Sequence, residues 1–234
     1  MEPVLFYGVP HGCSFGSIVA LEWLNVPYRL CRIEMPVDPN EETYVRVNPS
    51  RQTPALLTKD KDVLNESFAI LHHLAALDLT KKLGFKQGTK EFDQLNYVLS
   101  FLHASFHPSW VPLFAPHKAS DDPSAHEGIK AKALERVTRG YARIESILEG
   151  REWLVADGPT VADAYLYGIS RWGEDLGLID IKKDFPNIQK LREKMAKDKA
   201  VIFAHAIEDQ HPATTSGQFL GHVSLEELKS LIPS

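Results

Sequence analysis

Short apolar runs alternate with stretches of helical periodicity over the first third of the chain. The predicted elements, in chain order, are a strand over 4–7, a helix over 14–24, a strand over 29–35, a helix over 40–47, two strands over 55–58 and 62–64, and a helix over 67–77. Lys59-Asp60-Lys61 separates the two short strands and predicts a hairpin. This order of elements is typical of an α/β domain.

From Glu91 onward the apolar positions recur with the period of a helix, and no segment alternates as a strand does. The pattern predicts helices that begin near residues 91, 124, 160, 187 and 200. We therefore expect an α/β domain over 1–77, a linker over 78–90, an all-α helical domain over 91–210, and a tail over 211–234. Within the tail, Ser224 and Glu227 form a capping-box pattern that predicts a short helix.

Composition and charge narrow the class of protein. The chain has 234 residues and a formal net charge of −5, and it has no block of like charges, which argues against nucleic acid or an anionic membrane surface as a partner. The apolar runs are shorter than the roughly 18 residues that a membrane span needs. The N-terminus lacks the pattern of a secretory signal, and two cysteines make no disulfide framework. We expect a cytoplasmic protein.

Cys13 lies in a glycine-containing loop immediately before the first predicted helix. The dipole and free N–H groups of a helix N-terminus lower the pKa of a thiol, so this position predicts a reactive thiolate. Cys31, inside a predicted strand, fits the ordinary role of cysteine as a small buried apolar residue.

Two further pairs of residues suggest a binding surface. Thr53-Pro54 precedes a strand, and a cis bond there would leave the Thr53 backbone free to pair with an extended peptide ligand. Glu66-Ser67 stands at the start of a predicted helix, where a hydroxyl and free N–H groups suit a carboxylate. An ordinary trans proline and a simple helix cap are the alternatives.

His103 and His107 are four positions apart on one predicted helix, as two ligands of a metal can be. A glutamate after His103 is missing, since Ala104 stands there, and no third ligand is evident. We expect no metal site. Thr160 and Asp163 form a helix capping box, to which we assign a role in folding only.

Taken together, these motifs resemble the cytosolic glutathione transferases, and within them the bacterial beta class. The resemblance spans about residues 3 to 208, and its order and spacing are specific. It rests on Gly12-Cys13-Ser14, Asn48-Pro49, Gln52-Thr53-Pro54-Ala55-Leu56, Asn65-Glu66-Ser67, Leu102-His103, Pro112-Leu113-Phe114, Thr160 to Leu166, Arg171-Trp172 and Phe185-Pro186-Asn187.

The resemblance implies a thioredoxin-like N-terminal domain, an all-helical C-terminal domain, a homodimer, and glutathione as co-substrate with no metal. The cysteinyl part of glutathione would pair with Thr53 beside cis-Pro54, and its γ-glutamyl carboxylate would lie on Ser67 with Glu66 beside it. Gln52 and Arg51 would reach the glycyl carboxylate, although many relatives carry glycine where Arg51 stands. His103 matches a histidine at the glutathione site, but its neighbours Phe101 and Ala104 depart from the class pattern.

Three residues are candidates to act on the thiol of glutathione: Cys13 first, Ser14 second and Tyr7 third. Cys13 and Ser14 stand at a helix start, whereas Tyr7 belongs to a strand. By position in the family, the acceptor pocket would be lined by Phe106, His107, Trp110 and Trp172. Packing in the core is the alternative for these side chains, above all for Phe106.

The implied activity is the conjugation of glutathione thiolate to a small hydrophobic electrophile. A glutathione-dependent disulfide reductase or peroxidase acting through Cys13 is an alternative, with a disulfide as substrate. A second alternative is a non-catalytic module that uses the transferase fold for protein interactions, to which the tail over 211–234 would contribute.

Overall fold

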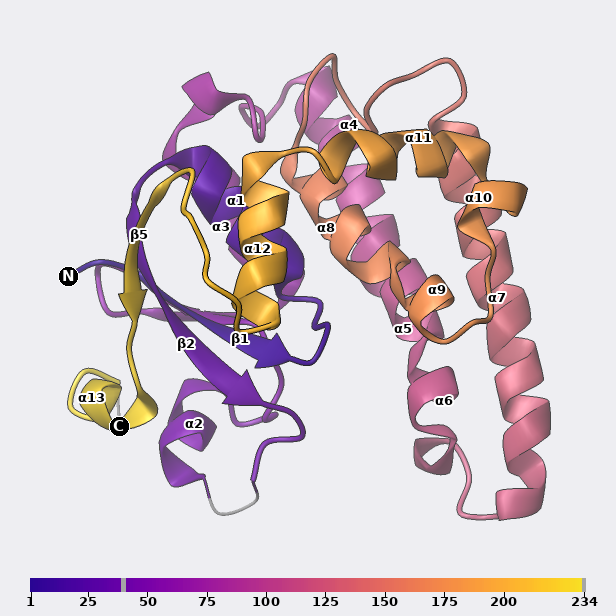
Figure 1. The fold of residues 1–234 in the computed structure, drawn as a ribbon, viewed down its shortest axis with the longest axis horizontal. Helices are drawn as coiled ribbons and strands as arrows, with labels where there is room; N and C mark the ends of the chain where they lie inside the picture. Colours follow the sequence, from indigo (N-terminus) through magenta and orange to yellow (C-terminus); the bar gives the residue numbers. More distant parts are fainter. Residues whose placement is uncertain (39–40, 233–234) are drawn as a thin grey trace.

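The computed structural model describes residues 1–38 and 41–232, so the predicted helix start at Asn40 lies outside the described residues. A small α/β unit and a larger helical unit lie side by side (Figure 1). The elements of the first unit are β1 (Val4–Val9), α1 (Phe15–Leu24), β2 (Pro27–Glu34), α2 (Glu42–Val47), β3 (Ala55–Leu57), β4 (Val63–Asn65) and α3 (Ser67–Leu77). Within this described part, no helix is long and apolar enough to cross a membrane.

The sheet has the strand order β4-β3-β1-β2-β5, where β5 (Gln218–His222) comes from the tail. β1 and β2 run parallel, with Leu5 opposite Leu30, whereas β3 is antiparallel to β1 and forms the predicted hairpin with β4. All six residues of β1 are buried because helices cover one face of the sheet and α2 with the tail covers the other. The predicted α/β fold is confirmed.

The tail corrects the expectation that no strand follows residue 91. β5 pairs in parallel with β2 and becomes the edge of the sheet (Figure 1). After it, α13 (Leu225–Leu228) begins at Ser224 with the predicted capping box. Leu228 and Ile232 are buried against the sheet face that α2 also covers, beside Tyr44. The tail therefore completes the N-terminal unit.

The second unit consists of helices. They are α4 (Lys90–Phe101), a π-helical turn (Leu102–Phe106), α5 (His107–Ser109), α6 (Val111–Phe114), α7 (His126–Ile147), α8 (Val161–Ser170), α9 (Trp172–Asp175), α10 (Ile181–Asp184), α11 (Pro186–Met195) and α12 (Lys199–Glu208). Short 3₁₀ turns over Leu79–Lys81, Pro116–Lys118 and Pro123–Ala125 join them. The predicted helix starts at 91, 124, 160, 187 and 200 agree with the starts of α4, α7, α8, α11 and α12. The first predicted helix is interrupted by the π-helical turn, and the period does not predict the short helices α6, α9 and α10.

Helices α1 and α8 hold the two units together. A Cβ at Gly16 would stand 2.7 Å from the Cα of Tyr165, so only glycine permits this approach of the two backbones. The loop before α1 is thereby brought against α8, and this is where Cys13 lies.

Candidate functional site

Three segments that are distant in sequence meet at the thiol of Cys13. Cys13 stands in the loop between β1 and α1, and its Sγ donates to the carbonyl oxygen of Thr53 at 3.3 Å. The hydroxyl of Ser67, the first residue of α3, lies 3.9 Å from the same sulfur. The candidates from the three motifs thus form one cluster.

The thiol does not have the acidity that the sequence predicts. Burial raises the pKa of Cys13 to about 11, although the hydrogen bond from Ser67 acts in the opposite direction. Ser14, and not Cys13, is the N-cap residue of α1, and the Cys13 sulfur donates to the Thr53 carbonyl oxygen. In this structure Cys13 is a neutral hydrogen-bond donor.

The backbone beside Cys13 is held in a fixed shape. The Thr53-Pro54 peptide is cis, as the resemblance implies. The Tyr44 hydroxyl and the Asn48 side-chain amide donate to the carbonyl oxygen of Gln52 at 2.7 and 2.8 Å. The side chains of Arg51 and Gln52 are exposed at this edge, where they are accessible to a ligand.

The start of α3 is linked to the helical unit through Glu66 and His103. Glu66 precedes the helix with a φ of 71°, and its Oε2 lies 3.4 Å from Nε2 of His103. His103 belongs to the π-helical turn, a feature that recurs at functional sites. Ser67 is 3% exposed, so a ligand that reaches its hydroxyl must enter the space between the two units.

Tyr165 on α8 belongs to the cluster and was not predicted. Its hydroxyl lies 2.7 Å from Nδ1 of His107 and close to Ser67, and its pKa is raised by burial and by the nearby Cys13. Burial, reinforced by His103, lowers the pKa of His107 to about 4, so its imidazole is neutral at pH 7. The sequence motif from Thr160 to Leu166 contains Tyr165, but its helical pattern indicates packing only.

Two of the three candidates for action on the thiol face elsewhere. The Ser14 hydroxyl is buried and bonds to the backbone N–H and carbonyl of Gly8, at 3.1 and 3.4 Å. The Tyr7 hydroxyl lies 3.0 Å from Nε2 of His222 on β5, on the side of the tail. Of the three, the structure leaves only Cys13 beside Thr53 and Ser67.

The aromatic residues expected in an acceptor pocket belong to the core. Phe106 and Trp110 are at most 1% exposed and pack edge to face against each other and against Tyr141. Trp172 is also buried, and its indole N–H donates to the carbonyl oxygen of His11 at 2.8 Å, which steadies the loop before Cys13. The pocket-lining role is therefore wrong for Phe106 and Trp110, because both rings are buried against Tyr141 of α7.

A buried ion pair contacts the loop that carries Cys13. Arg171 and Glu208 approach to 2.6 Å with side chains almost fully buried, and the Arg171 guanidinium lies 4.3 Å from the ring centre of Phe15. Arg171 also donates to the carbonyl oxygen of Gly12 at 3.4 Å. Residues 1–38 and 41–232 contain no group of three or more side chains placed to hold a metal ion.

Known proteins share both the sequence and the fold. Residues 13–77 match the family described as glutathione S-transferase, N-terminal domain, and residues 101–198 match the corresponding C-terminal domain. Glutathione S-transferase GstA of Escherichia coli O157:H7 is 30% identical over 174 residues, 72% of this chain and 81% of that protein. Glutathione S-transferase GST-4.5 of Xanthomonas campestris pv. campestris is 28% identical over 172 residues, 74% of this chain and 83% of that protein.

Solved structures agree with these matches. A sphingomonad glutathione S-transferase in complex with glutathione is 30% identical and superposes with a TM-score of 0.78, covering 88% of this chain and 98% of that one. The glutathione S-transferase of Xylella fastidiosa is 25% identical with a TM-score of 0.80, covering 89% of this chain and 99% of that one. The chain belongs to the glutathione S-transferase family.

Proposed function

We propose that the protein binds glutathione and conjugates its thiolate to a small hydrophobic electrophile. One observation carries the proposal: the Cys13 sulfur lies 3.3 Å from the Thr53 carbonyl oxygen and 3.9 Å from the Ser67 hydroxyl oxygen. The related sphingomonad enzyme, described in complex with glutathione, supports the choice of ligand.

Glutathione fits this site as an extended peptide with a negative charge at each end. Its cysteinyl main chain would pair with the backbone of Thr53, and its γ-glutamyl carboxylate would lie on the hydroxyl of Ser67 and the free N–H groups at the start of α3. The carboxylate of Glu66, beside His103, suits the ammonium group of the same γ-glutamyl unit. Gln52 and Arg51 are placed for the glycyl carboxylate.

The raised pKa of Cys13 gives this residue a definite role in the proposed reaction. The cysteinyl N–H of glutathione would compete for the Thr53 carbonyl oxygen, and the Cys13 S–H could then donate to the sulfur of the ligand. A donor of this kind stabilises the glutathione thiolate after its proton leaves to water. The thiolate sulfur then bonds to an electrophilic carbon, and the leaving group departs with its electron pair.

The same pKa favours conjugation over disulfide exchange through Cys13. Exchange needs a thiolate as nucleophile, and a thiol of pKa about 11 supplies little of it at pH 7. A purely structural role for the fold does not explain why Thr53, Ser67 and Cys13 meet at one site. We therefore place the transferase ahead of the two alternatives.

We also propose a homodimer in the cytoplasm. The family resemblance implies the homodimer, and analytical ultracentrifugation tests it. Both Cys13 and Cys31 are free, which suits a reducing compartment, and cell fractionation tests the location.

Calorimetric titration with reduced glutathione tests the proposed ligand. The wild type should bind saturably, Ser67→Ala should weaken binding by about tenfold or more, and Ser105→Ala, an exposed serine of the π-helical turn, should not. An activated aryl halide then tests conjugation. Absence of binding at millimolar glutathione, or equal binding by Ser67→Ala, contradicts the proposal.

A further inference from the structure

The helix of the C-terminal tail, α13, packs against α2 (Figure 1). Leu228 and Ile232 of the tail are buried in the same apolar cluster as Tyr44 of α2. On the surface beside this cluster, the guanidinium of Arg46, also on α2, donates to the carbonyl oxygen of Lys229 at 3.0 Å. The tail is therefore joined to α2 by an apolar contact and by a hydrogen bond.

Helix α2 is too short to be stable by itself. It has six residues, and a helix of this length is marginal in water, because its few hydrogen bonds do not offset the entropy cost of forming it. The position of α2 therefore depends on the side chains that pack against it. These are Phe6 of β1, whose ring centre lies 5.8 Å from that of Tyr44, and the two buried side chains of the tail.

Tyr44 of α2 and its C-cap residue Asn48 hold the backbone of the candidate glutathione site. The Tyr44 hydroxyl and the Asn48 side-chain amide donate to one carbonyl oxygen, that of Gln52, at 2.7 and 2.8 Å. Tyr44 is fully buried in a close-packed cluster, so its hydroxyl moves only if α2 moves. The next residue, Thr53, accepts from the Cys13 thiol and would pair with glutathione. A shift of α2 would therefore displace the backbone on which the ligand is proposed to lie.

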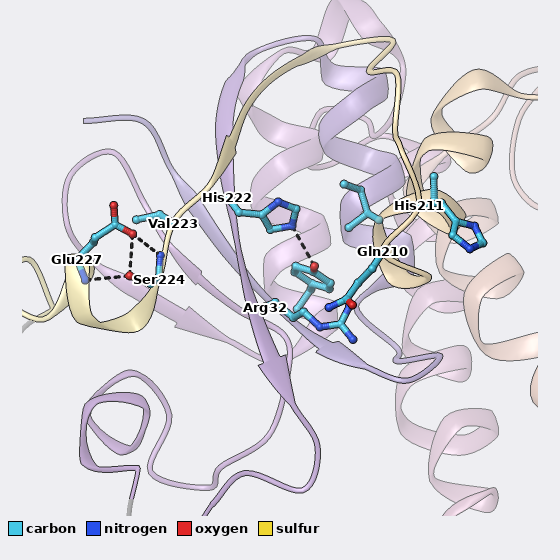
Figure 2. A pocket seen from close by; sticks show the side chains of 10 residues that line it. Arg32, Gln210, His211, His222, Val223, Ser224 and Glu227 are labelled. Atoms are coloured by element: carbon cyan, nitrogen blue, oxygen red, sulfur yellow. Dashed lines mark hydrogen bonds between the residues drawn. The ribbon is translucent and has the colours of Figure 1, made fainter.

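The tail helix is itself fixed at its start. The backbone N–H and the hydroxyl of Ser224 donate to the carboxylate of Glu227, both at 2.7 Å, and the N–H of Glu227 donates to the Ser224 hydroxyl at 3.3 Å (Figure 2). This capping box stabilises the first turn of α13, which brings Leu228 to its buried position. The stretches that match the family end at residue 198, so the contact with α2 is made by a segment outside them.

We propose that α13 is a positioning element of the glutathione site, which acts through α2 and the carbonyl oxygen of Gln52. The inference rests on the proposed binding of glutathione. Docking of the tail holds the backbone of Gln52 and Thr53 in its binding shape, so that less free energy is lost in ordering it when glutathione binds. The coupling is reciprocal, because a ligand that binds this shape of the backbone also favours the docked tail.

Leu228→Ala tests the proposal, since it removes a buried side chain between the tail and α2 and leaves the residues of the glutathione site unchanged. Leu220→Ala is the matched control, because Leu220 belongs to the same tail and is 44% exposed. In calorimetric titration with reduced glutathione, Leu228→Ala should raise the Kd about threefold or more, whereas Leu220→Ala should leave it within about twofold of the wild type. Unfolding midpoints establish that both variants are folded at the temperature of the titration.

Amide hydrogen exchange measures the coupling directly. The Asn48 amide donates to the Tyr44 carbonyl oxygen at 2.8 Å, so its exchange reports on the end of α2. It should exchange about threefold or more faster in Leu228→Ala than in the wild type. The Leu228 amide donates to the Ser224 carbonyl oxygen at 3.3 Å and reports on α13. In the wild type, saturating glutathione should slow its exchange by about threefold or more.

Equal affinity for glutathione in the wild type and in Leu228→Ala would overturn the proposal, as would a rate of Leu228 exchange that glutathione leaves unchanged. Equal losses of affinity in Leu228→Ala and Leu220→Ala would also overturn it, because the effect would then not come from the contact with α2. Absence of glutathione binding by the wild type would contradict the proposed function and this role together, whereas exchange at Asn48 tests the hold of the tail on α2 without any ligand.

Discussion

The carboxylate of Glu22, on α1, accepts hydrogen bonds from both the backbone N–H and the hydroxyl of Ser216, at 2.6 and 2.8 Å. The same buried carboxylate accepts from Thr215, from the N–H of Gly217 and from the hydroxyl of Tyr28. A charged group 2% exposed is tolerated because its oxygens are satisfied in this way. Glu22 thus anchors the tail immediately before β5.

Replacing Glu22 with glutamine should therefore release the tail. An amide group opposes the N–H donors of Ser216 and Gly217, and we expect a loss of about 2 to 4 kcal/mol in the free energy of unfolding. Urea unfolding measures the loss, and limited proteolysis should cut the variant between residues 210 and 217. Glu226→Gln, an exposed control in α13, should leave both unchanged, and a protease-resistant tail in Glu22→Gln would contradict the role of this carboxylate as anchor.

The acidity of Cys13 is open to a direct measurement. With a pKa of about 11, its rate of alkylation by iodoacetamide should rise about tenfold for each pH unit from 7 to 10 and level off only near pH 11. The Cys13→Ser variant gives the background from Cys31, whose pKa burial raises to about 12. A rate that levels off below pH 8 would show that the thiol is acidic, as the helix start alone predicts.

Two glycines of α7 should respond to alanine in opposite directions. A Cβ at Gly140 would stand 2.5 Å from the ring of Phe106, which is fully packed, so Gly140→Ala should cost about 1 to 3 kcal/mol of unfolding free energy. At Gly128 no described atom lies within 4 Å of such a Cβ, and Gly128→Ala should stabilise the protein by up to about 1 kcal/mol. Urea unfolding of both variants measures these changes. If the two substitutions changed the free energy of unfolding equally, the core position of Phe106 would be refuted.

The neutral imidazole of His107 makes stability depend on pH. Its pKa is about 4 in the folded protein and about 6.5 in the unfolded chain, so between these values the unfolded chain binds more protons and stability rises with pH. From pH 5 to 7 this group should contribute roughly 1 to 2 kcal/mol to the rise. His107→Gln should flatten the rise by that amount and the exposed His117→Gln should not, as urea unfolding at each pH can show. The pKa of His205 is also lowered to about 4, so His205 adds a similar slope in the wild type and in both variants.

Local patterns in the sequence are sufficient for most of the elements. Alternation and helical spacing predict the strands and helices of the N-terminal unit to within a few residues, because a buried strand and an amphipathic helix each impose their own period. The capping boxes at Thr160 and Ser224 are confirmed as well, since both partners lie within one turn.

The strand in the tail could not be found in this way. β5 is five residues long, and its two large apolar residues, Phe219 and Leu220, are adjacent, so its sequence does not show the alternation of a strand. What makes it a strand is the free edge of β2 and the anchor at Glu22, both far away in the chain. Only the folded structure brings these partners together.

The candidate site, too, is predicted from the sequence only in part. Local sequence patterns are enough to place Thr53-Pro54, Glu66-Ser67 and Cys13 at loop and helix-start positions, where backbone groups are free to bind a peptide. Only the folded chain shows that Cys13 donates to a carbonyl oxygen, that Tyr165 belongs to the site and that the Tyr7 hydroxyl is bonded to His222 instead. The physical reason is that acidity and accessibility depend on the groups that surround a side chain, and those groups come from segments that sequence spacing does not relate.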